Sequence, residues 1–271
     1  MTGIVDSHVH LLPGRLGEKV RAIFTDVGGY RLAYPADHGA VCEQLASEGV
    51  EQIWTLPYAH KPGVATGLNR AAAATAASGL AVDVIAGAAV HPGDDDPVGV
   101  VRRAVEDDGA RVLKLHCSVG SFDPTDPALE SVWEYVERIR LPVVLHAGTA
   151  VHGLTSLEDL GPVEEVARRH PEARVVIAHC GHDQEDVALG ILAAHPHVHA
   201  DLTPVVHRPV QISSEDAATF ADRLLFGTDA PNTELSASTC RRHVEGYGLA
   251  PDALAAVLGG NARRLVADVA T

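Results

Sequence analysis

Short runs of β-branched and apolar residues alternate with longer helical patterns along the whole chain, and this alternation limits the fold more than any other feature. The eight predicted strands are Ile4–His10, Glu51–Tyr58, Ala81–Pro92, Arg111–Cys117, Leu141–Ala147, Arg174–Cys180, Val198–Thr203 and Leu224–Asp229. Strands that alternate with helices predict a parallel sheet with right-handed crossovers. At 271 residues, eight such units predict a single-domain (β/α)8 TIM-like barrel over residues 1–271. A doubly wound open sheet is the alternative, but no GxGxxG sequence follows any strand.

The helical patterns fill the intervals between these strands. The predicted helices are Gly39–Glu48, Ala65–Ala77, Val98–Asp107, Ala128–Arg138, Leu157–Arg169, Gln184–Ala194, Ser214–Asp222 and a C-terminal pair after Ser236. Arg15 to Asp37 does not follow the alternation. We expect it to form a long first loop that lies over the mouth of the barrel.

Composition excludes several classes of function. The formal net charge is −15, and a nucleic-acid-binding protein needs a basic surface, so neither nucleic acid nor an acidic membrane surface is an expected partner. The most apolar stretch, Ala71 to Val90, is too interrupted for a membrane span. The four cysteines form no CxxC pair, and the first strand begins too early for a signal peptide, so we expect a cytoplasmic protein. Sixteen histidines is a high count for this length.

Several of these histidines stand at the carboxyl ends of predicted strands. In "VDSHVH" the side chains of Asp6, His8 and His10 share one strand face, because alternate residues of a strand point the same way. Later strands end in "VLKLHC", "VVLHAG", "VVIAHCG" and "LLFGTDAP", which place Lys114, His116, His146, His179 and Asp229 at corresponding points. The carboxyl ends of barrel strands meet on one face, where active sites are built.

A metal site explains this pattern better than chance does. A single histidine at a strand end is usually hydrogen-bonded or solvated, but histidines at four strand ends and an aspartate at a fifth are hard to obtain by accident. Imidazole and carboxylate together suit zinc, manganese, iron or cobalt. Buried without a metal, these groups would each need another polar partner. We therefore expect one divalent metal ion, with zinc the first choice.

The same motifs resemble the metal-dependent amidohydrolase superfamily. "DSHVH", "KLH", "LPVVLHAG", "VIAHCG" and "FGTDAP" are most similar to the branch that contains aminocarboxymuconate-semialdehyde-type decarboxylases and related hydrolases. The resemblance implies a distorted barrel whose metal is held by His8, His10, His146 and Asp229. It places His179 close by, as a second-site ligand or an acid–base group. Family habit also suggests a homodimer.

The resemblance implies two reactions on a small-molecule substrate. The first is hydrolysis of an amide, lactone or ester, in which Asp229 takes a proton from the attacking water and His179 hydrogen-bonds the substrate carbonyl oxygen. The second is non-oxidative decarboxylation, in which Asp229 protonates the carbon that loses carbon dioxide. A catalytically inactive barrel that only binds a partner is a third reading, and the complete ligand set argues against it.

Lys114 and His116 form the expected substrate-binding part of the site. Lys114 shares the inward face with His116, where some superfamily members carry a carboxylated lysine that bridges two metal ions. A protonated Lys114 would instead bind a substrate carboxylate or phosphate. A short distance to the metal favours the carbamate, and a long distance favours the cation. The mononuclear branch is the better match, so we predict one metal ion and a substrate-binding Lys114.

Other polar and aromatic residues have simpler interpretations. Asp6 is expected at the barrel floor or beneath the ligands. His91 could line the pocket or simply end its strand. Tyr58 is expected to pack against the second strand, and His199 is expected to be solvated. Cys180 is expected in the core and not as a nucleophile.

Overall fold

Eight parallel strands in the order β1-β2-β3-β4-β5-β6-β7-β8 form the centre of the molecule in a computed structural model, which describes residues 3–147 and 156–270. The strands are β1 (Ile4–Val9), β2 (Val50–Thr55), β3 (Asp83–Ala89), β4 (Val112–Leu115), β5 (Val143–Leu145), β6 (Val175–Ile177), β7 (His199–Asp201) and β8 (Leu224–Leu225). Each overlaps a predicted strand and is shorter than it. The predicted (β/α)8 barrel is confirmed.

Backbone hydrogen bonds between β1 and the segment after β8 bring the two edges of the sheet together. The Ser7 amide donates to the Phe226 carbonyl (2.9 Å), and the Asp229 amide donates to the His8 carbonyl (2.9 Å). The His10 amide then donates to the Ala230 carbonyl at 2.7 Å. This closure places the "SHVH" and "GTDA" segments side by side at the carboxyl end of the barrel.

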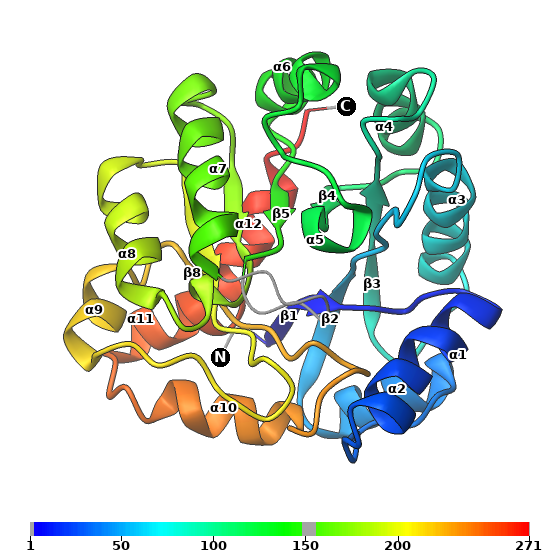
Figure 1. Cartoon of the computed structure of the whole chain (residues 1–271). Helices are drawn as coiled ribbons and strands as arrows, with labels where there is room; N and C mark the ends of the chain where they lie inside the picture. Colours follow the sequence, from blue (N-terminus) through cyan, green and yellow to red (C-terminus); the bar gives the residue numbers. More distant parts are fainter. Residues whose placement is uncertain (1–2, 148–155, 271) are drawn as a thin grey trace.

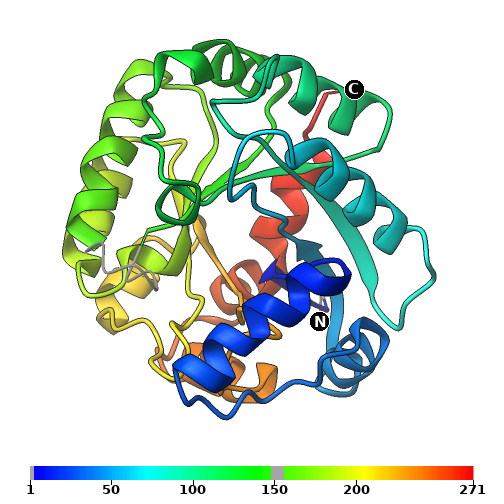
Figure 2. The ribbon, with the colours of Figure 1, turned by 45° about the vertical axis from the view of Figure 1, so that its right-hand side comes forward.

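Helices surround the strands, as the turned view shows (Figure 2). They are α1 (Gly14–Ala22), α2 (His38–Ser47), α3 (Ala65–Ala76), α4 (Pro97–Glu106), α5 (Cys117–Gly120), α6 (Glu130–Ile139), α7 (Ser156–Arg169), α8 (Glu185–Ala194), α9 (Ser214–Thr219), α10 (Ala237–Glu245), α11 (Pro251–Ala255) and α12 (Asn261–Ala267). Side-chain caps fix several of their starts. Asp37, Asp96, Ser213 and Ser236 each accept a backbone N–H from the first turn of the helix that follows. None of the helices in the described part of the chain is long and apolar enough to cross a membrane.

The predicted first loop is wrong in one respect, because most of Arg15 to Asp37 is not irregular. Helix α1 is followed by a π-helical turn, Ile23–Val27, and no side chain of either segment is buried. The sequence gives little sign of helix α1, because the helix has no side-chain N-cap and is not followed by a strand. Of this segment, Val27 is the most exposed large apolar residue, at 80%.

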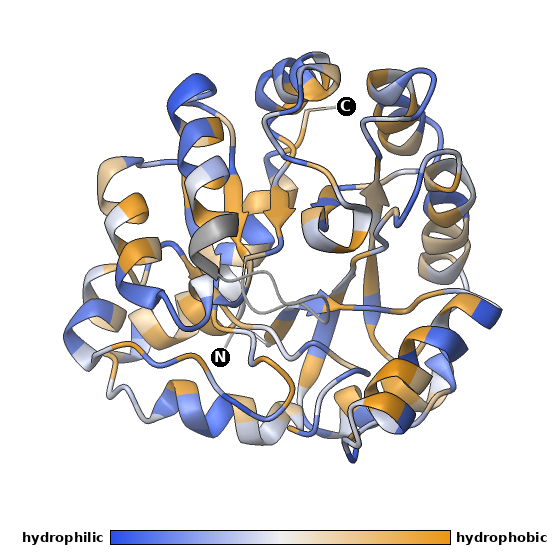
Figure 3. Cartoon of the chain, viewed as in Figure 1, coloured by the Kyte–Doolittle hydropathy of each residue, from blue (hydrophilic) through white to orange (hydrophobic). Residues whose placement is uncertain are grey.

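The barrel interior changes from apolar to polar along its strands. Trp54, Val112 and Val144 belong to an apolar cluster that the C-terminal helix α12 joins through Leu265. The Arg263 guanidinium of α12 donates to the Gly3 carbonyl just before β1, so this apolar end is the amino end of the strands. Figure 3 shows the apolar strands and the mixed polarity of the helices around them. Two residues beyond Val112 and Val144, the same strand faces carry Lys114 and His146, which is why the polar site lies at the carboxyl end.

Candidate active site

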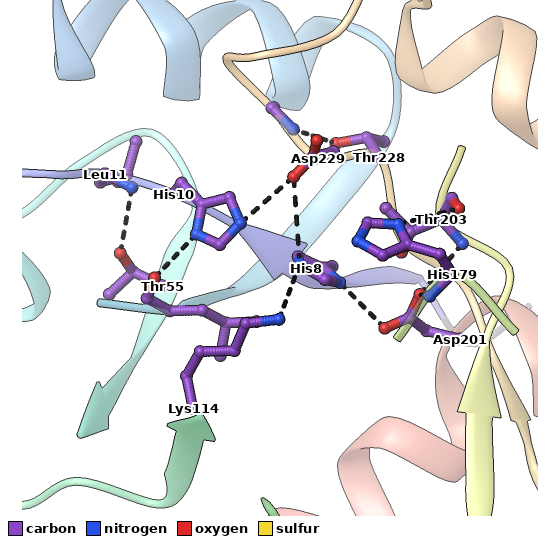
Figure 4. Close-up of polar contacts among 12 residues, drawn as sticks. His8, His10, Leu11, Thr55, Lys114, His179, Asp201, Thr203, Thr228 and Asp229 are labelled. Carbon is purple, nitrogen blue, oxygen red and sulfur yellow. Dashed lines mark hydrogen bonds and ion pairs between the residues drawn. The ribbon is translucent and has the colours of Figure 1, made fainter. Parts of the chain in front are cut away.

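Two histidines, His8 in β1 and His10 directly after it, are held by hydrogen bonds that fix their ring orientation (Figure 4). His8 Nδ1 lies 2.9 Å from Asp201 Oδ2, and His10 Nδ1 lies 2.7 Å from the Leu56 carbonyl oxygen. A carbonyl oxygen and an ionised carboxylate can only accept hydrogen bonds, so the Nδ1 atom of each ring must carry the ring hydrogen and donate it. Each ring therefore presents a lone pair on Nε2.

Asp229 faces both rings from the segment after β8. Its Oδ1 lies 3.2 Å from His10 Nε2 and 3.9 Å from His8 Nε2. The backbone at Asp229 is left-handed, with φ at 67°, an uncommon conformation that aims its side chain at β1. Gly227 is required just before it, because a Cβ there would collide with Thr203 Oγ1 and come within 2.9 Å of His8 Cβ.

These three side chains form an arrangement that fits a cation. The ligand atoms of His8, His10 and Asp229 lie within 4.8 Å of one another, and all three residues offer electron pairs. Acceptors that face each other repel unless a donor or a cation lies among them, so this cluster favours a bound cation. Two imidazoles and one carboxylate are a donor set that suits zinc and related divalent ions. The residues present therefore fit the expected metal.

Asp201 at the end of β7 supports this arrangement, and sequence reasoning missed it. Its Oδ2 accepts from His8, while its Oδ1 accepts the His179 amide at 2.8 Å and the Thr203 amide at 3.2 Å. Asp201 is fully buried. A signal was available, because "ADLT" ends the seventh predicted strand with a carboxylate, but no histidine accompanies it at that point.

His179 lies beside His8, with ring centroids 4.8 Å apart. It belongs to a short turn after β6, Ala178–Gly181, in which His179 has a left-handed φ of 56°. Its Nδ1 lies 3.3 Å from the Thr203 carbonyl oxygen, so this nitrogen donates and Nε2 keeps a lone pair. The ring can thus accept a proton or bind a cation.

Lys114 reaches across the interior from β4 to the same site. Its side chain is fully buried, and its Nζ lies 3.3 Å from His8 Nε2, where the ammonium can donate to the lone pair. Burial lowers the pKa of Lys114 to about 8. The role of Lys114 as a substrate-binding cation stays a prediction.

His146 and His116 lie next to this group and are stacked on each other. Their ring centroids are 3.9 Å apart, and the His146 ring is also 5.2 Å from that of His179. His146 Nε2 is buried and has no hydrogen-bond partner among the described residues, which leaves it open to a ligand. It is not part of the converging trio. Its role as a fourth ligand stays a prediction.

Tyr58 is a site residue that the sequence did not reveal. Its ring lies edge-on to His10 at 5.3 Å and 5.0 Å from the ring of His116, so it forms a wall of the site and does not only pack against β2. A tyrosine at the end of a strand packs in the core more often than it lines a site, and nothing in "LPYAH" distinguishes the two.

The weaker candidates lie around this centre or away from it. Asp6 lies beneath the ligands and accepts from the His8 amide and the Thr228 hydroxyl. His91 accepts the Gly93 amide and donates to the Gly120 carbonyl, so both of its nitrogens are engaged. His199 is buried and not solvated as expected, because it opens β7 against the helices.

Burial keeps four histidines of the site neutral. It lowers the pKa of His8, His116, His146 and His179 well below the usual value, and the neighbouring cationic groups lower it further. Burial raises the pKa of Asp229. Neutral imidazole is the form that binds metal ions, so the rings are ready to act as ligands without losing a proton first.

Known structures share this barrel. An uncharacterized TIM-barrel protein from Bordetella bronchiseptica is 20% identical, with a TM-score of 0.76 over 98% of both chains. A 5-carboxyvanillate decarboxylase from Sphingomonas paucimobilis is 13% identical, with a TM-score of 0.67 over 100% of both chains. The L-hydantoinase (dihydropyrimidinase) of Arthrobacter aurescens is 16% identical, with a TM-score of 0.66 over 98% of this chain and 71% of its own.

These identities are low, and the likeness establishes the fold alone. A search of curated proteins finds no match. The family model described as amidohydrolase matches residues 5–267, which is nearly the whole chain. The protein therefore belongs to the amidohydrolase family, whose members use a divalent metal ion.

Proposed function

We propose that this protein is a metal-dependent hydrolase that cleaves a C–N or C–O bond in a small molecule, such as an amide, lactone or ester. One observation carries the proposal. His8 Nε2, His10 Nε2 and Asp229 Oδ1 converge with their electron pairs facing one another, at the carboxyl end of a barrel of the amidohydrolase family. His8, His10 and Asp229 are the residues that would hold the metal, with His146 as a fourth ligand.

The residues of the chain divide the chemistry between them. A divalent ion bound at these atoms supplies the positive charge that acidifies water and polarises a carbonyl group. Asp229 Oδ1 takes the proton of the attacking water and passes it to the leaving group, a role that suits a carboxyl group whose pKa burial raises. In the sequence-based interpretation His179 donates to the substrate carbonyl oxygen, but its Nδ1 faces the Thr203 carbonyl oxygen and its Nε2 keeps a lone pair. We therefore assign His179 Nε2 to orienting the water by accepting its second hydrogen.

Lys114 and His116 hold the substrate in this proposal. The Lys114 amine is a donor inside a site otherwise rich in acceptors, so it can hydrogen-bond a substrate carboxylate or carbonyl group. His116 forms a flat wall with His146 on one side and Tyr58 on the other.

Decarboxylation is the second candidate, and Lys114 is the observation that favours it. A buried amine next to the ligand cluster can bind a substrate carboxylate, and Asp229 can then protonate the carbon that loses carbon dioxide. The barrel is shared with a 5-carboxyvanillate decarboxylase as well as with a hydantoinase, which is in keeping with either reaction.

Assays of the purified protein separate the two reactions. The protein is loaded in turn with Zn²⁺, Mn²⁺ and Co²⁺ and incubated with panels of lactones, cyclic amides, esters and aromatic carboxylic acids. We expect ring opening or ester cleavage that Asp229→Asn slows by at least about 100-fold. Release of carbon dioxide from an acid, with no hydrolysis of any other panel member, would instead establish the decarboxylase.

A further inference from the structure

A cavity of about 530 Å³ opens beside the site, between the segment that follows β4 and helix α7. His146 forms part of its wall, so the cavity adjoins the ligand cluster directly. Nothing in the proposed chemistry uses this space. A volume of a few hundred Å³ is typical of small-molecule pockets, and a cavity of about 150 Å³ is enough to bind benzene. The cavity therefore has room for a ring with substituents.

Apolar side chains make up most of the wall. They are Phe122 and Pro124 from the segment after β4, Leu145 at the end of β5, and Pro162 and Val163 from α7. Two of them, Leu145 and Val163, are buried in the core, so packing fixes the shape of the wall at these two residues. Such a wall favours an apolar group, and each CH₂ buried against it contributes about 0.8 kcal/mol.

The polar residues of the wall lack a positive charge. No lysine or arginine is found among the described residues that line the cavity, whereas Asp123 is. Its Oδ1 accepts from the Thr125 amide at 2.8 Å and from the Thr125 hydroxyl at 2.6 Å, which fixes the side chain. Asp123 is exposed, and no described residue hydrogen-bonds its Oδ2, so its negative charge is hydrated but not paired with a cation at the cavity.

We infer that this cavity receives an uncharged, apolar ring of the substrate, and that Phe122 and Asp123 determine this specificity. Phe122 supplies the aromatic wall, and Asp123 repels a second anionic group at the far end of the substrate. The inference rests on the proposed function, because it assumes that a small-molecule substrate binds at the metal ligands. It narrows the substrate class to compounds with one reactive polar end, which faces the metal ligands and Lys114, and one neutral ring.

One neutral probe and one charged probe test this inference without any catalytic turnover. Benzyl alcohol and 4-(hydroxymethyl)benzoate share a ring and differ by one carboxylate. Their binding to the full-length protein is measured by ligand-observed NMR titration, and the metal content of each sample is determined separately. We expect benzyl alcohol to bind about fivefold more tightly than the benzoate, because like charges repel across the partly solvated cavity. We expect Phe122→Ala to weaken benzyl alcohol binding about fivefold, since an apolar wall is lost.

Matched variants isolate the two residues. Asp123→Asn keeps an Oδ1 that can accept from Thr125, so the turn is preserved while the charge is removed, and the benzoate should then bind as well as benzyl alcohol. Phe24→Ala and Asp95→Asn make the same changes outside the cavity and should leave both affinities unchanged. Thermal unfolding confirms that each variant is folded.

Two results overturn the inference. One is equal binding of both probes to the wild type, and the other is an affinity for benzyl alcohol that Phe122→Ala does not change. Because the probes need no metal, these results leave the proposed function intact. Probe binding with the expected pattern in a protein that takes up no metal would instead refute the proposed function and support the pocket.

Discussion

Replacing Asp201 by asparagine should weaken metal binding although Asp201 is not expected to touch the metal. Asp201 Oδ1 accepts two backbone amides, those of His179 and Thr203, and Oδ2 accepts His8 Nδ1–H. An asparagine has only one acceptor oxygen. The two amides hold it, so the NH₂ group must face His8 Nδ1.

That reversal changes the tautomer of His8. With a donor opposite it, Nδ1 must accept, and the hydrogen moves to Nε2, the atom that faces Asp229. The lone pair needed for the metal is then lost unless the hydrogen bond breaks. Changes of this kind behind a metal-binding histidine cost about 10- to 100-fold in affinity, or about 1.4–2.7 kcal/mol.

The assay is competition with a chromophoric chelator for Zn²⁺, together with ¹⁵N NMR of labelled histidine to identify the tautomer. Asp6→Asn is the matched control, because Asp6 is equally buried but accepts from the backbone amide of His8 and not from its ring. It should change the affinity less than about threefold. An unchanged affinity in Asp201→Asn, or a loss of equal size in Asp6→Asn, would refute the reasoning.

Four further outcomes are expected. Asp229→Asn should keep the fold and lower kcat/KM by about 10²- to 10⁴-fold in steady-state assays, because it removes the proton acceptor; a loss below tenfold would exclude that role. Lys114→Ala should keep one metal ion per chain and mainly raise KM, whereas two ions per chain that fall with this replacement and return with a short carboxylic acid would establish a bridging carbamate. Gly227→Ala should lower the free energy of unfolding by about 1–3 kcal/mol in denaturant titrations, because its Cβ would meet Thr203 and His8, and an unchanged midpoint would contradict this. Burial lowers the pKa of His199 to about 4, so the unfolded chain takes up a proton at a higher pH than the folded chain does. The free energy of unfolding should therefore fall as pH drops from about 6.5 to about 4, by at most about 3 kcal/mol. Urea titrations at each pH should show that His199→Gln removes this part of the loss.

The fold could be predicted because its signals repeat. Each of the eight predicted strands overlaps an observed strand, and Ile4–Val9 differs from its prediction by one residue. The predicted strands are too long because the apolar pattern continues in the sequence beyond the last residue that pairs with a neighbouring strand. His116 is an example, since it was predicted within a strand but is the N-cap of α5. Helix α1 was missed because it breaks the alternation and buries no side chain.

The sequence predicts those residues of the candidate site that stand in recognisable motifs at the ends of strands. His8, His10 and Asp229 converge because barrel closure places β8 beside β1, and alternation sets which side chains point inward. Asp201 and Tyr58 lie at the same level, but one carboxylate or one tyrosine at a strand end has no distinguishing motif. The short distance from Lys114 to His8 spans the interior between two strands that are not neighbours, which sequence spacing does not report.

Metal content measured by elemental analysis tests the central claim most directly. Wild-type protein and the double variant His8→Ala/His10→Ala are purified, incubated with Zn²⁺ or Mn²⁺, freed of unbound ions and analysed after circular dichroism has shown that both are folded. The account predicts one divalent ion per wild-type chain and a loss of at least about 90% in the double variant, since two of three converging ligands are gone. A folded wild-type protein that holds no divalent ion and gains none on incubation would contradict it.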